Sequence, residues 1–217
     1  MIEYLSHQGS DNSIANTARV SMQFDGNWEE LPENYTEEQR DKLIDYLATH
    51  KHTSPFRHNS LTIRCKFPIF LARQLGKHQV GLSWNEVSRR YVIGDIEFFY
   101  PDFWRAAPEG SIKQGSGGEH PQSPLIMGEY GEYLTFCLDF YDSLIDRGVA
   151  PEQARMVLPQ SMQTEIVWTG SLMAFAHVYN LRADGHAQKE AQDFAEALDN
   201  VIKPLFPVSW KALTGSK

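Results

Sequence analysis

Cysteine, positive charge and long apolar runs are all scarce in this sequence. Cys65 and Cys137 are the only cysteines among 217 residues, too few and too far apart for a disulfide framework, so we expect a reducing compartment, the cytoplasm. The formal net charge of -8 excludes the broad basic surface on which nonspecific duplex binding depends. No basic N-terminal stretch leads into an apolar run, and no run reaches the roughly 18 residues of a membrane span. We therefore predict neither a nucleic-acid partner nor a membrane partner.

The composition is that of an ordinary globular protein. Apolar residues make up 41% and charged residues 22% of the chain, and a chain of 217 residues can bury a core without disulfides or metals. No internal repeat divides the sequence. We predict a single domain over residues 1–217.

Helical patterns dominate the chain. Thr36 and Gln39 have the spacing of a capping box, and apolar residues then recur at helical intervals to about residue 48. A longer helical pattern runs from Pro124 to Arg147, and Gly148 is placed to end it. Further helices are predicted from Pro68 to about His78, from Pro151 to about Met156, from Gly170 to Leu181 and from His186 to Ile202.

Strand patterns are fewer. Residues 60–67, SLTIRCKF, alternate apolar with polar side chains, which is the periodicity of a strand with one buried face. The apolar segment 92–101 is predicted as a second strand region. Residues 106–123 contain four glycines and two prolines and almost nothing to bury, so we expect a flexible surface excursion there. Many helices and few strands indicate an α+β fold, in which a small, mostly antiparallel sheet packs against several helices.

The segment KHQVGLSWNEVSRRY, residues 77–91, is unusually polar and follows an apolar helix pattern. Arg89 and Arg90 are adjacent planar cations suited to a phosphate or a carboxylate, and the hydroxyl of Ser88 lies next to them in the chain. Together with backbone N–H groups in a turn, such residues can hold an anion. A capped turn with a surface ion pair between Glu86 and Arg90 fits the same spacing, and the spacing does not separate the two interpretations.

A second polar group contains His50, His52 and His58. Imidazoles are common ligands of zinc and iron, which raises the hypothesis of a metal site. No cysteine or carboxylate within the same stretch completes a ligand set, and histidines in loops more often serve as hydrogen-bonding groups. We therefore predict no bound metal.

Two arginines lie beside helix ends. Arg155 precedes a helix stop at Pro159, and Arg182 stands next to the Asp184–Gly185 break, near His186. An arginine at such a break can project its flat donor array into a cleft, where it suits a planar ligand with acceptor oxygens. Favourable interaction with the helix dipole explains the same position without a ligand.

Five motifs, in this order, resemble the flavin-dependent thymidylate synthases, the ThyX family: HTSPFRH, PIFLARQ, SWNEVSRRY, ARMVLP and NLRADGHAQ. They extend from His52 to Gln188 and so cover most of the chain. The family signature is Arg-His-Arg, seven residues and then Ser. Here the corresponding residues are Lys77, His78 and Gln79, and eight residues precede Ser88, so one residue is inserted within 80–82.

The resemblance implies roles for individual residues. Arg182 is the implied catalytic residue, which contacts the uracil ring and favours ionisation at N3. The residues implied to bind dUMP are Gln74, Lys77, Glu86, Ser88, Arg89, Arg90, Arg155 and Arg182. Those implied to bind FAD are His52, Ser54, Lys77, His78, Gln79, Glu86 and His177, the last at a position where many relatives carry asparagine. Ser171 to Met173 also correspond by position to flavin contacts, although their residue types differ.

The reaction implied by the resemblance is the reductive methylation of dUMP to dTMP, with methylenetetrahydrofolate as carbon donor and NADPH-reduced FAD as hydride source. A homotetramer with shared active sites is implied as well. Cys65 reads as an inward strand residue and Cys137 as a helix residue, and neither has the cationic surroundings of an activated thiolate, which is consistent with a route that uses no cysteine nucleophile.

Three alternatives remain open. Lys77 and Gln79 in place of the signature arginines leave room for another C5 modification of a uridine nucleotide, for example hydroxymethylation, or for a nucleotide-binding module without catalysis. A metal-dependent hydrolase that uses the three histidines is the third.

Overall fold

A four-stranded antiparallel sheet forms the centre of the molecule. The structure is a computed structural model that describes residues 2–108, 110 and 115–216. The strands are β1 (Ile2–Gln8), β2 (Ser60–Pro68), β3 (Leu82–Glu86) and β4 (Gln163–Gly170), in the spatial order β1-β2-β4-β3. Every neighbouring pair is antiparallel. The predicted α+β fold with a small antiparallel sheet is confirmed.

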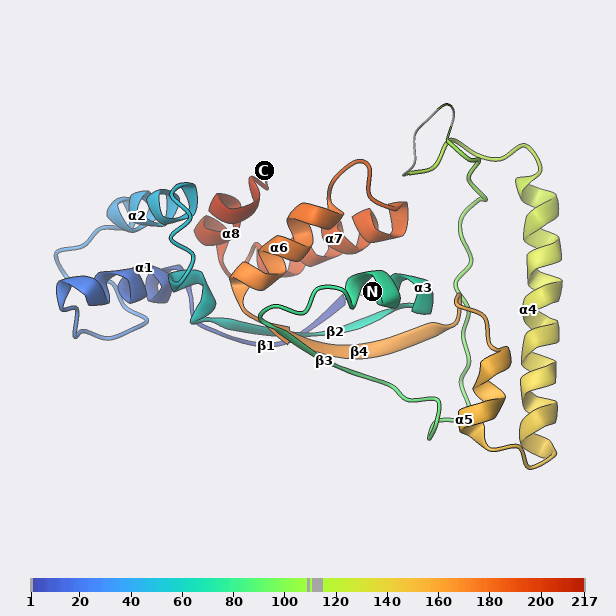
Figure 1. Cartoon of the computed structure of the whole chain (residues 1–217). Coiled ribbons are helices and arrows are strands. Elements are labelled where there is room, and N and C mark those ends of the chain that lie inside the picture. Colours follow the sequence, from blue (N-terminus) through green and yellow to red (C-terminus); the bar gives the residue numbers. More distant parts are fainter. Residues whose placement is uncertain (1, 109, 111–114, 217) are drawn as a thin grey trace.

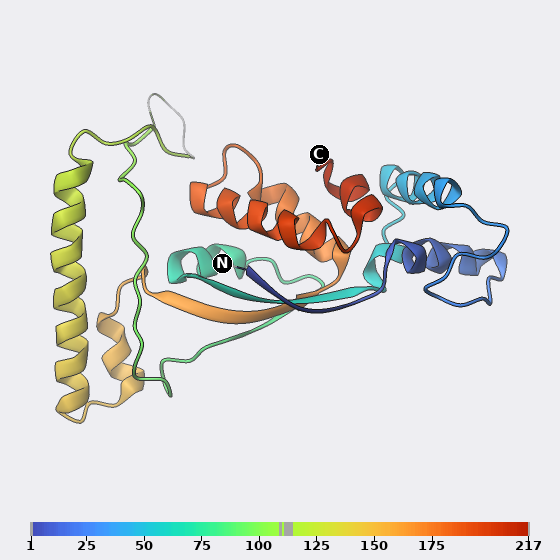
Figure 2. The ribbon, with the colours of Figure 1, turned by 180° about the vertical axis from the view of Figure 1, so that it is seen from behind.

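Helices gather on one face and at both ends of the sheet. Figures 1 and 2 show α3, α6, α7 and α8 above one face, α1 and α2 beyond one end, and α4 and α5 beyond the other. The bounds are α1 Asp11–Arg19, α2 Glu37–Thr49, α3 Ile69–Leu75, α4 Ser123–Asp146, α5 Pro151–Ala154, α6 Leu172–Arg182, α7 Lys189–Ile202 and α8 Pro207–Thr214. Short 3-10 turns occupy Val20–Met22, Pro55–Arg57 and Arg155–Val157. None of the described helices is long and apolar enough to cross a membrane.

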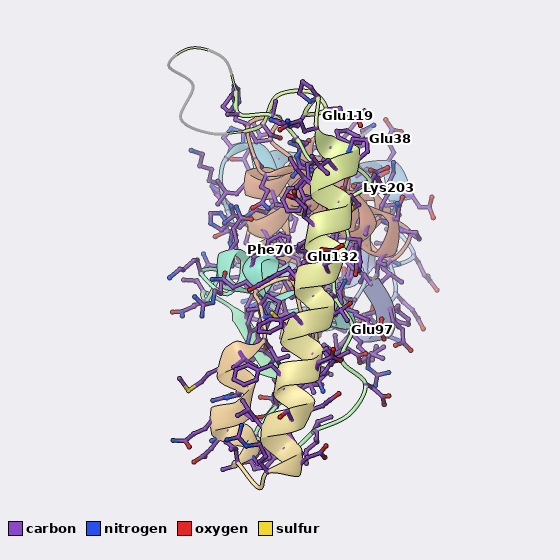
Figure 3. All side chains as sticks on the ribbon, turned by 90° about the vertical axis from the view of Figure 1, so that its right-hand side faces the viewer. Glu38, Phe70, Glu97, Glu119, Glu132 and Lys203 are labelled. Atoms are coloured by element: carbon purple, nitrogen blue, oxygen red, sulfur yellow. The ribbon has the colours of Figure 1, made fainter. Side chains whose placement is uncertain are left out.

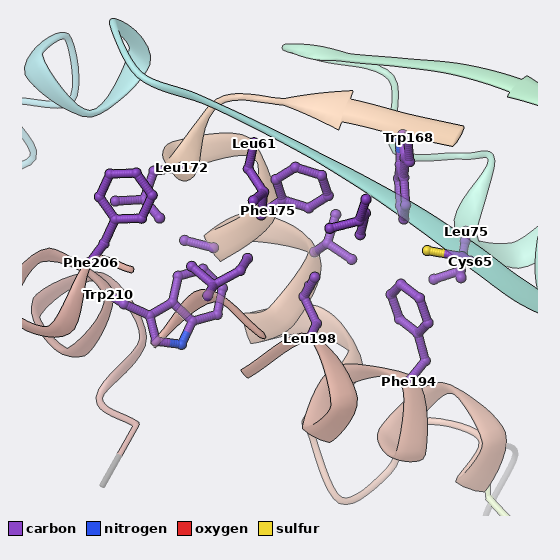
Figure 4. Close-up of a cluster of buried hydrophobic side chains, with 14 of the residues drawn as sticks. Leu61, Cys65, Leu75, Trp168, Leu172, Phe175, Phe194, Leu198, Phe206 and Trp210 are labelled. Atoms are coloured by element: carbon purple, nitrogen blue, oxygen red, sulfur yellow. The ribbon is translucent and has the colours of Figure 1, made fainter. Parts of the chain in front are cut away.

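The core lies between the sheet and its helical layer. The predicted alternation of β2 is confirmed: Leu61, Ile63, Cys65 and Phe67 are buried. Figure 4 shows inward side chains of the sheet meeting those of the helices that cover it. Burial of these side chains supplies the main driving force for the fold. It also raises the pKa of the Cys65 thiol to about 12.

The capping residues predicted at the start of α2 and the end of α4 are present in the structure. The Thr36 side chain accepts from the Gln39 backbone N–H at 3.3 Å, and the Gln39 amide oxygen accepts from the Thr36 N–H at 2.9 Å, which completes the capping box of α2. At the end of α4, Gly148 adopts φ +80°, a conformation open to glycine at little cost. The predicted helices at 151–156, 170–181 and 186–202 are present with shifted bounds, as α5 with its 3-10 turn, α6 and α7.

The strand predicted over residues 92–101 is wrong. Among the described residues, this segment makes one isolated bridge, between Phe98 and Met162. Asp95 has φ +52°, which interrupts an extended backbone. The two terminal nitrogens of Arg89 donate to the carbonyls of Gly94 and Asp95, so the segment begins as a closed loop rather than a strand.

The helix predicted after Pro68 is shorter than expected. Pro68 is the last residue of β2 and the N-cap of α3, and the helix ends at Leu75 instead of continuing to His78. The His78 N–H bonds to the Leu75 carbonyl at 2.9 Å, which turns the chain out of the helix. The predicted flexible excursion at 106–123 includes residues 109 and 111–114, which lie outside the described residues.

Candidate active site

The polar segment 77–91 is brought against the start of α6 by strand pairing. β3 runs antiparallel to β4, so that Leu82 pairs with Gly170. A Cβ on Gly170 would lie 2.9 Å from the Gly81 carbonyl oxygen and would also meet the Leu82 side chain, so glycine favours this close approach. Gly81, in the stretch that carries the inserted residue, has φ +72°, and its carbonyl accepts from the Ser171 N–H at 3.3 Å. This turn fixes the preceding residues beside the start of α6.

His78 and Arg182 meet at this place. Arg182 Nε donates to His78 Nε2 at 3.0 Å, although the two residues are 104 positions apart. The ring of His177 stands 5.7 Å from the ring of His78, nearly edge to face. His78 and Arg182 come from segments that the sequence pattern singled out, and His177 is implied by the family resemblance; the structure places the three in one cluster.

Burial and charge keep His78 neutral. Desolvation, the positive charge of Arg182 and the neighbouring His177 lower the pKa of His78 to about 4. Because Arg182 Nε–H can only donate, His78 Nε2 must be the unprotonated nitrogen, and the ring proton resides on Nδ1. Burial also lowers the pKa of Arg182, but an arginine remains a cation at neutral pH.

A cavity of about 840 Å³ opens beside Arg182. Gln74 from α3 lines it, together with Asn180, Asp184, His186 and Gln188. The Gln74 side-chain oxygen is buried and finds no hydrogen-bond partner among the described protein atoms. Such an orphaned acceptor carries a desolvation cost unless a ligand donor meets it. The cavity therefore combines a cationic donor array with an acceptor that is ready for a polar ligand.

Three arginines of the candidate site, Arg89, Arg90 and Arg155, lie on an arm. This arm is formed by α4, α5 and the loop that follows β3. Figure 1 shows this loop descending to the α5 end of α4. Arg90 Nε donates to Ser88 Oγ at 3.3 Å, and Arg155 Nε donates to the Glu152 carbonyl at 3.1 Å. Arg90 and Arg155 are both exposed, whereas the Arg89 guanidinium is occupied by its own loop.

The residues implied for dUMP therefore fall into two groups. One group lies where the end of α3 meets the end of α6, a region that we call the α3–α6 end, and comprises Gln74, Lys77 and Arg182. The other group lies on the arm and comprises Ser88, Arg89, Arg90 and Arg155. Glu86 ends β3 between them and accepts from Thr164 Oγ1 at 2.8 Å. Among the described ion pairs, none joins Glu86 to Arg90, so the surface ion pair considered as an alternative is not formed.

The residues implied for FAD are mostly near the start of α6. The connection that holds His52 and Ser54 is tied to α6 through Asn59, whose Oδ1 accepts from the Leu172 N–H at 2.8 Å. Ser171 caps the helix by accepting from the Ala174 N–H. Lys77 and Gln79, which precede β3 in the chain, are exposed. These imidazole, ammonium and amide groups fit a cofactor with many acceptor atoms and a dianionic diphosphate.

The three histidines considered as metal ligands do not form a ligand set. His50 and His52 have ring centroids 6.4 Å apart, with Tyr46 beside both. Over the described residues, no group of three His, Cys, Asp or Glu side chains could hold a metal ion. The metal-dependent hydrolase alternative therefore lacks its site.

One polar network was missed by sequence reasoning. Arg105 donates to both carboxylate oxygens of Glu190, at 2.7 and 3.0 Å, and Gln188 Nε2 donates to the same carboxylate at 2.8 Å. Burial alone would raise the pKa of Glu190, but the hydrogen bonds from Arg105 and Gln188 hold it below its ordinary value. The network fixes Gln188 at the edge of the cavity. The one sequence signal for this network is Glu190 in the first turn of α7. A charged residue at that position usually indicates only a solvated helix end.

Solved structures with the same architecture include a UMP/dUMP methylase. The chain is similar to PolB from Streptomyces cacaoi bound with 5-Br dUMP, with a TM-score of 0.87, 30% identity and coverage of 99% of this chain and 94% of that one. The same methylase bound with 5-Br UMP gives a TM-score of 0.85 and 29% identity, with coverage of 99% of this chain and 93% of that one.

Similar curated proteins include flavin-dependent thymidylate synthases. A flavin-dependent thymidylate synthase from Pseudothermotoga lettingae is 34% identical over 97% of this chain and 88% of its own length. Another from Kosmotoga olearia is 36% identical over the same shares of the two chains. Residues 2–208 match the family described as "Thymidylate synthase complementing protein". From this match and from these identities, the chain belongs to the thymidylate synthase complementing protein family, that of the flavin-dependent thymidylate synthases.

Proposed function

We propose that this protein is a flavin-dependent thymidylate synthase. It converts dUMP to dTMP by reductive methylation, with methylenetetrahydrofolate as the carbon donor and FAD reduced by NADPH. The observation that carries the proposal is that Gln74 and Arg182 line one cavity while His78 accepts a hydrogen bond from Arg182, since these residues come from separate motifs of the family. Their chemistry suits a uracil ring, which offers carbonyl acceptors and an N–H donor in one plane.

Arg182 is the residue to which we assign activation of the base. Its guanidinium can donate to a uracil carbonyl and stabilise the negative charge that spreads over the ring when N3 ionises. The half-buried setting strengthens this interaction relative to water. Gln74 supplies the acceptor for a nucleotide donor, which would satisfy its orphaned oxygen. FAD, when bound, supplies the hydride, and the residues that would hold it are His52, Ser54, Lys77, His78, Gln79, Glu86 and His177.

No cysteine is positioned to act as a nucleophile. The two cysteines are buried, and burial raises the pKa of Cys65 to about 12, so its thiolate is essentially absent near neutral pH. A nucleotide in the cavity would also be out of reach of Cys65, because this side chain points into the core between the sheet and α7 (Figure 4). This supports a route in which charge stabilisation by Arg182 replaces covalent activation.

The phosphate is assigned to the arm of a second copy of the chain. Arg90 and Arg155 are exposed cations beside Ser88 and α5, and arginine forks suit a phosphate. Arg89 would act mainly by shaping the loop that carries Arg90. Since the arm lies beyond one end of the sheet (Figure 1), a site that uses both groups draws them most simply from two copies, and we propose the homotetramer with shared active sites.

The outer face of α4 supports this assembly. Leu125, Tyr133, Phe136 and Phe140 are exposed on that helix, Phe136 by 65%. In Figure 3 no other part of the described chain lies over the side of α4 that carries Glu132. Exposed aromatic side chains on one helix commonly mark an interface between subunits. A second copy of the same chain is the occupant that a symmetric assembly provides.

The test of the proposed function is a flavin spectrum. Purified protein supplied with FAD should bleach on addition of NADPH and regain its absorbance when dUMP and methylenetetrahydrofolate follow, with dTMP as the product by mass. A protein that binds no FAD contradicts the proposal. A product one oxygen heavier than dTMP would instead identify hydroxymethylation. UMP belongs in the same assay, because the similar Streptomyces cacaoi enzyme is a UMP/dUMP methylase.

A further inference from the structure

Arg182 is oriented by a neutral partner. Its Nε donates to His78 Nε2 at 3.0 Å, and among the described residues no carboxylate pairs with it. Asp184, two residues away, is engaged by the N–H and the ring of His186, at 2.8 and 3.0 Å. The guanidinium therefore keeps its full positive charge while one edge of it is fixed. A carboxylate partner would fix the same edge but would also neutralise the charge that a bound uracil requires.

His78 itself is held from two sides. Its backbone N–H bonds to the Leu75 carbonyl at 2.9 Å, and the next turn is anchored where Ser171 N–H bonds to the Gly81 carbonyl. The ring packs edge to face with His177. A hydrogen-bond acceptor fixed in this way can limit the rotation of Arg182 before any ligand arrives, which is the condition for electrostatic preorganisation.

The ring nitrogens have separate tasks. Nε2 must carry the lone pair, because Arg182 Nε–H donates to it, and so Nδ1 carries the proton. Within the described residues, the His78 side chain makes one hydrogen bond, the one from Arg182, so the Nδ1–H is available to a ligand. One imidazole can therefore contact a bound molecule with one nitrogen and orient the arginine with the other.

We propose that His78 is the positioning residue for Arg182, and that its unprotonated Nε2 sets the direction of the guanidinium without neutralising it. This inference rests on the proposed function, since it assigns the orientation of the arginine that would contact uracil. It adds a second role to a residue that the family resemblance connects only with flavin.

A double-mutant cycle tests the positioning role. His78→Met keeps the size of the side chain but removes the strong acceptor, and His78→Gln offers an amide oxygen near the place of Nε2. Hydrogen bonds to charged groups support an expected loss in kcat of about 10- to 100-fold for His78→Met, with most of it restored in His78→Gln and a smaller change in the KM for dUMP. Arg182→Lys should cost much less in the His78→Met background than in the wild type.

The control is His50→Met, which alters an exposed ring at the end of α2 whose described hydrogen bond runs to the Tyr46 carbonyl and not to His78 or Arg182. Its effect should combine with that of Arg182→Lys independently, as fold-changes that multiply. If the effects of His78→Met and Arg182→Lys also multiply, or if His78→Gln is as impaired as His78→Met, the positioning role is wrong. FAD content, measured by absorbance for every variant, separates loss of cofactor from loss of orientation.

Nitrogen NMR of ¹⁵N-histidine-labelled protein without ligands tests the geometry independently of turnover. The expected result at pH 7 is a neutral His78 ring with its proton on Nδ1. A protonated ring or a proton on Nε2 overturns the inference. If wild-type protein fails to process dUMP while the NMR result holds, the proposed function fails and the hydrogen bond stands. If turnover is normal but the cycle is additive, the positioning role fails and the proposed function stands.

Discussion

The arginines at the α3–α6 end and on the arm differ in burial and in the residues that hold them. Arg182 is half-buried, and a histidine from a distant segment fixes one edge of it. Arg155 and Arg90 are exposed, and the hydrogen bonds that hold them run to residues of their own turns, Glu152 and Ser88. The first arrangement is complete before a ligand arrives, whereas the second leaves most donors facing solvent.

This difference indicates two roles, stabilisation of charge during the reaction and binding of a phosphate. A preorganised charge in a partly desolvated place acts strongly on charge that develops during a reaction. Exposed arginines bind a phosphate through charge-assisted hydrogen bonds, but they are screened by salt. We therefore expect the α3–α6 end to control turnover and the arm to control binding, and the predictions that follow are ordered by the size of the expected effect.

Arg182→Ala should have the largest effect. Loss of the charge beside the uracil is expected to lower kcat by at least about 100-fold, the scale for removal of one donor that stabilises developing charge. The fold should survive, because one described hydrogen bond is lost, and the midpoint of thermal unfolding checks this. Arg155→Ala is the matched comparison and should raise the KM for dUMP more than it lowers kcat. Equal effects on kcat from both variants would remove the distinction between the two regions.

Phe136→Asp on α4 should dissociate the assembly. The side chain is 65% exposed in the single chain, so a charge there costs the monomer fold little, but it would be buried unpaired in an interface between copies. Light scattering should show a smaller species, and activity should fall with it. Glu132→Gln, on the same helix, is the control. An assembly unchanged by Phe136→Asp would show that α4 contributes no interface.

Arg90→Ala should weaken dUMP binding by about 10-fold, the scale of a lost charge-assisted hydrogen bond, with a smaller change in kcat. The dependence of KM on salt should become shallower, because one screened charge is gone. Arg89→Ala should act differently. Since Arg89 holds the carbonyls of Gly94 and Asp95, its loss should loosen the loop, which proteolysis between 89 and 95 would detect. If the two variants showed the same KM for dUMP, the same salt dependence and the same proteolysis, the separate roles of Arg90 and Arg89 would be contradicted.

The smallest expected effect is on stability against pH. The pKa of His78 is about 4 in the folded chain, below its ordinary value of 6.5, so between these values the unfolded chain binds more protons. This contribution is fully present above about pH 6.5 and is lost as the pH falls toward 4. The charged and titratable groups that face His78 are Arg182 and His177.

His78→Gln, which does not titrate, should therefore lose less thermal stability between pH 7.5 and 5 than the wild type. Because His78 is only half-buried, solvent screening limits the difference to about 2 °C or less in the unfolding midpoint. Parallel curves for the two proteins would show that His78 titrates near its ordinary pKa, and the neutral acceptor role would lose its support.

Local signals account for the parts of the fold that the sequence predicts. The capping box of α2 and the alternation of β2 each depend on residues close together in the chain. β3 is absent from the sequence-based prediction, although Leu82 and Trp84 alternate with Ser83 and Asn85, because the polar residues of this segment are typical of turns. Strand formation there depends on pairing with β4, about 80 residues away, which no local window contains.

The candidate site shows the same limit. The family resemblance assigns Gln74 and Arg182 to dUMP and His78 to FAD, but the hydrogen bond between His78 and Arg182 joins residues 104 positions apart and could be found only in three dimensions. Arg105 and Glu190 carried no motif at all. The false strand at 92–101 has the opposite cause: its composition favours a strand, but the contacts of Arg89 and the conformation of Asp95 close it into a loop.

Subunit complementation tests the central claim most directly, namely that one active site joins the α3–α6 end of one copy to the arm of another. Arg182→Ala and Arg155→Ala proteins would be co-expressed in equal amounts, and the mixed assembly would be assayed for dTMP formation at a dUMP concentration well below the wild-type KM, where loss of either arginine lowers the rate. We predict recovery to about a quarter of wild-type activity, because each site draws each arginine from an unaltered copy half of the time. Activity no higher than the mean of the two separate variants would contradict the claim and place both groups in the site of a single chain.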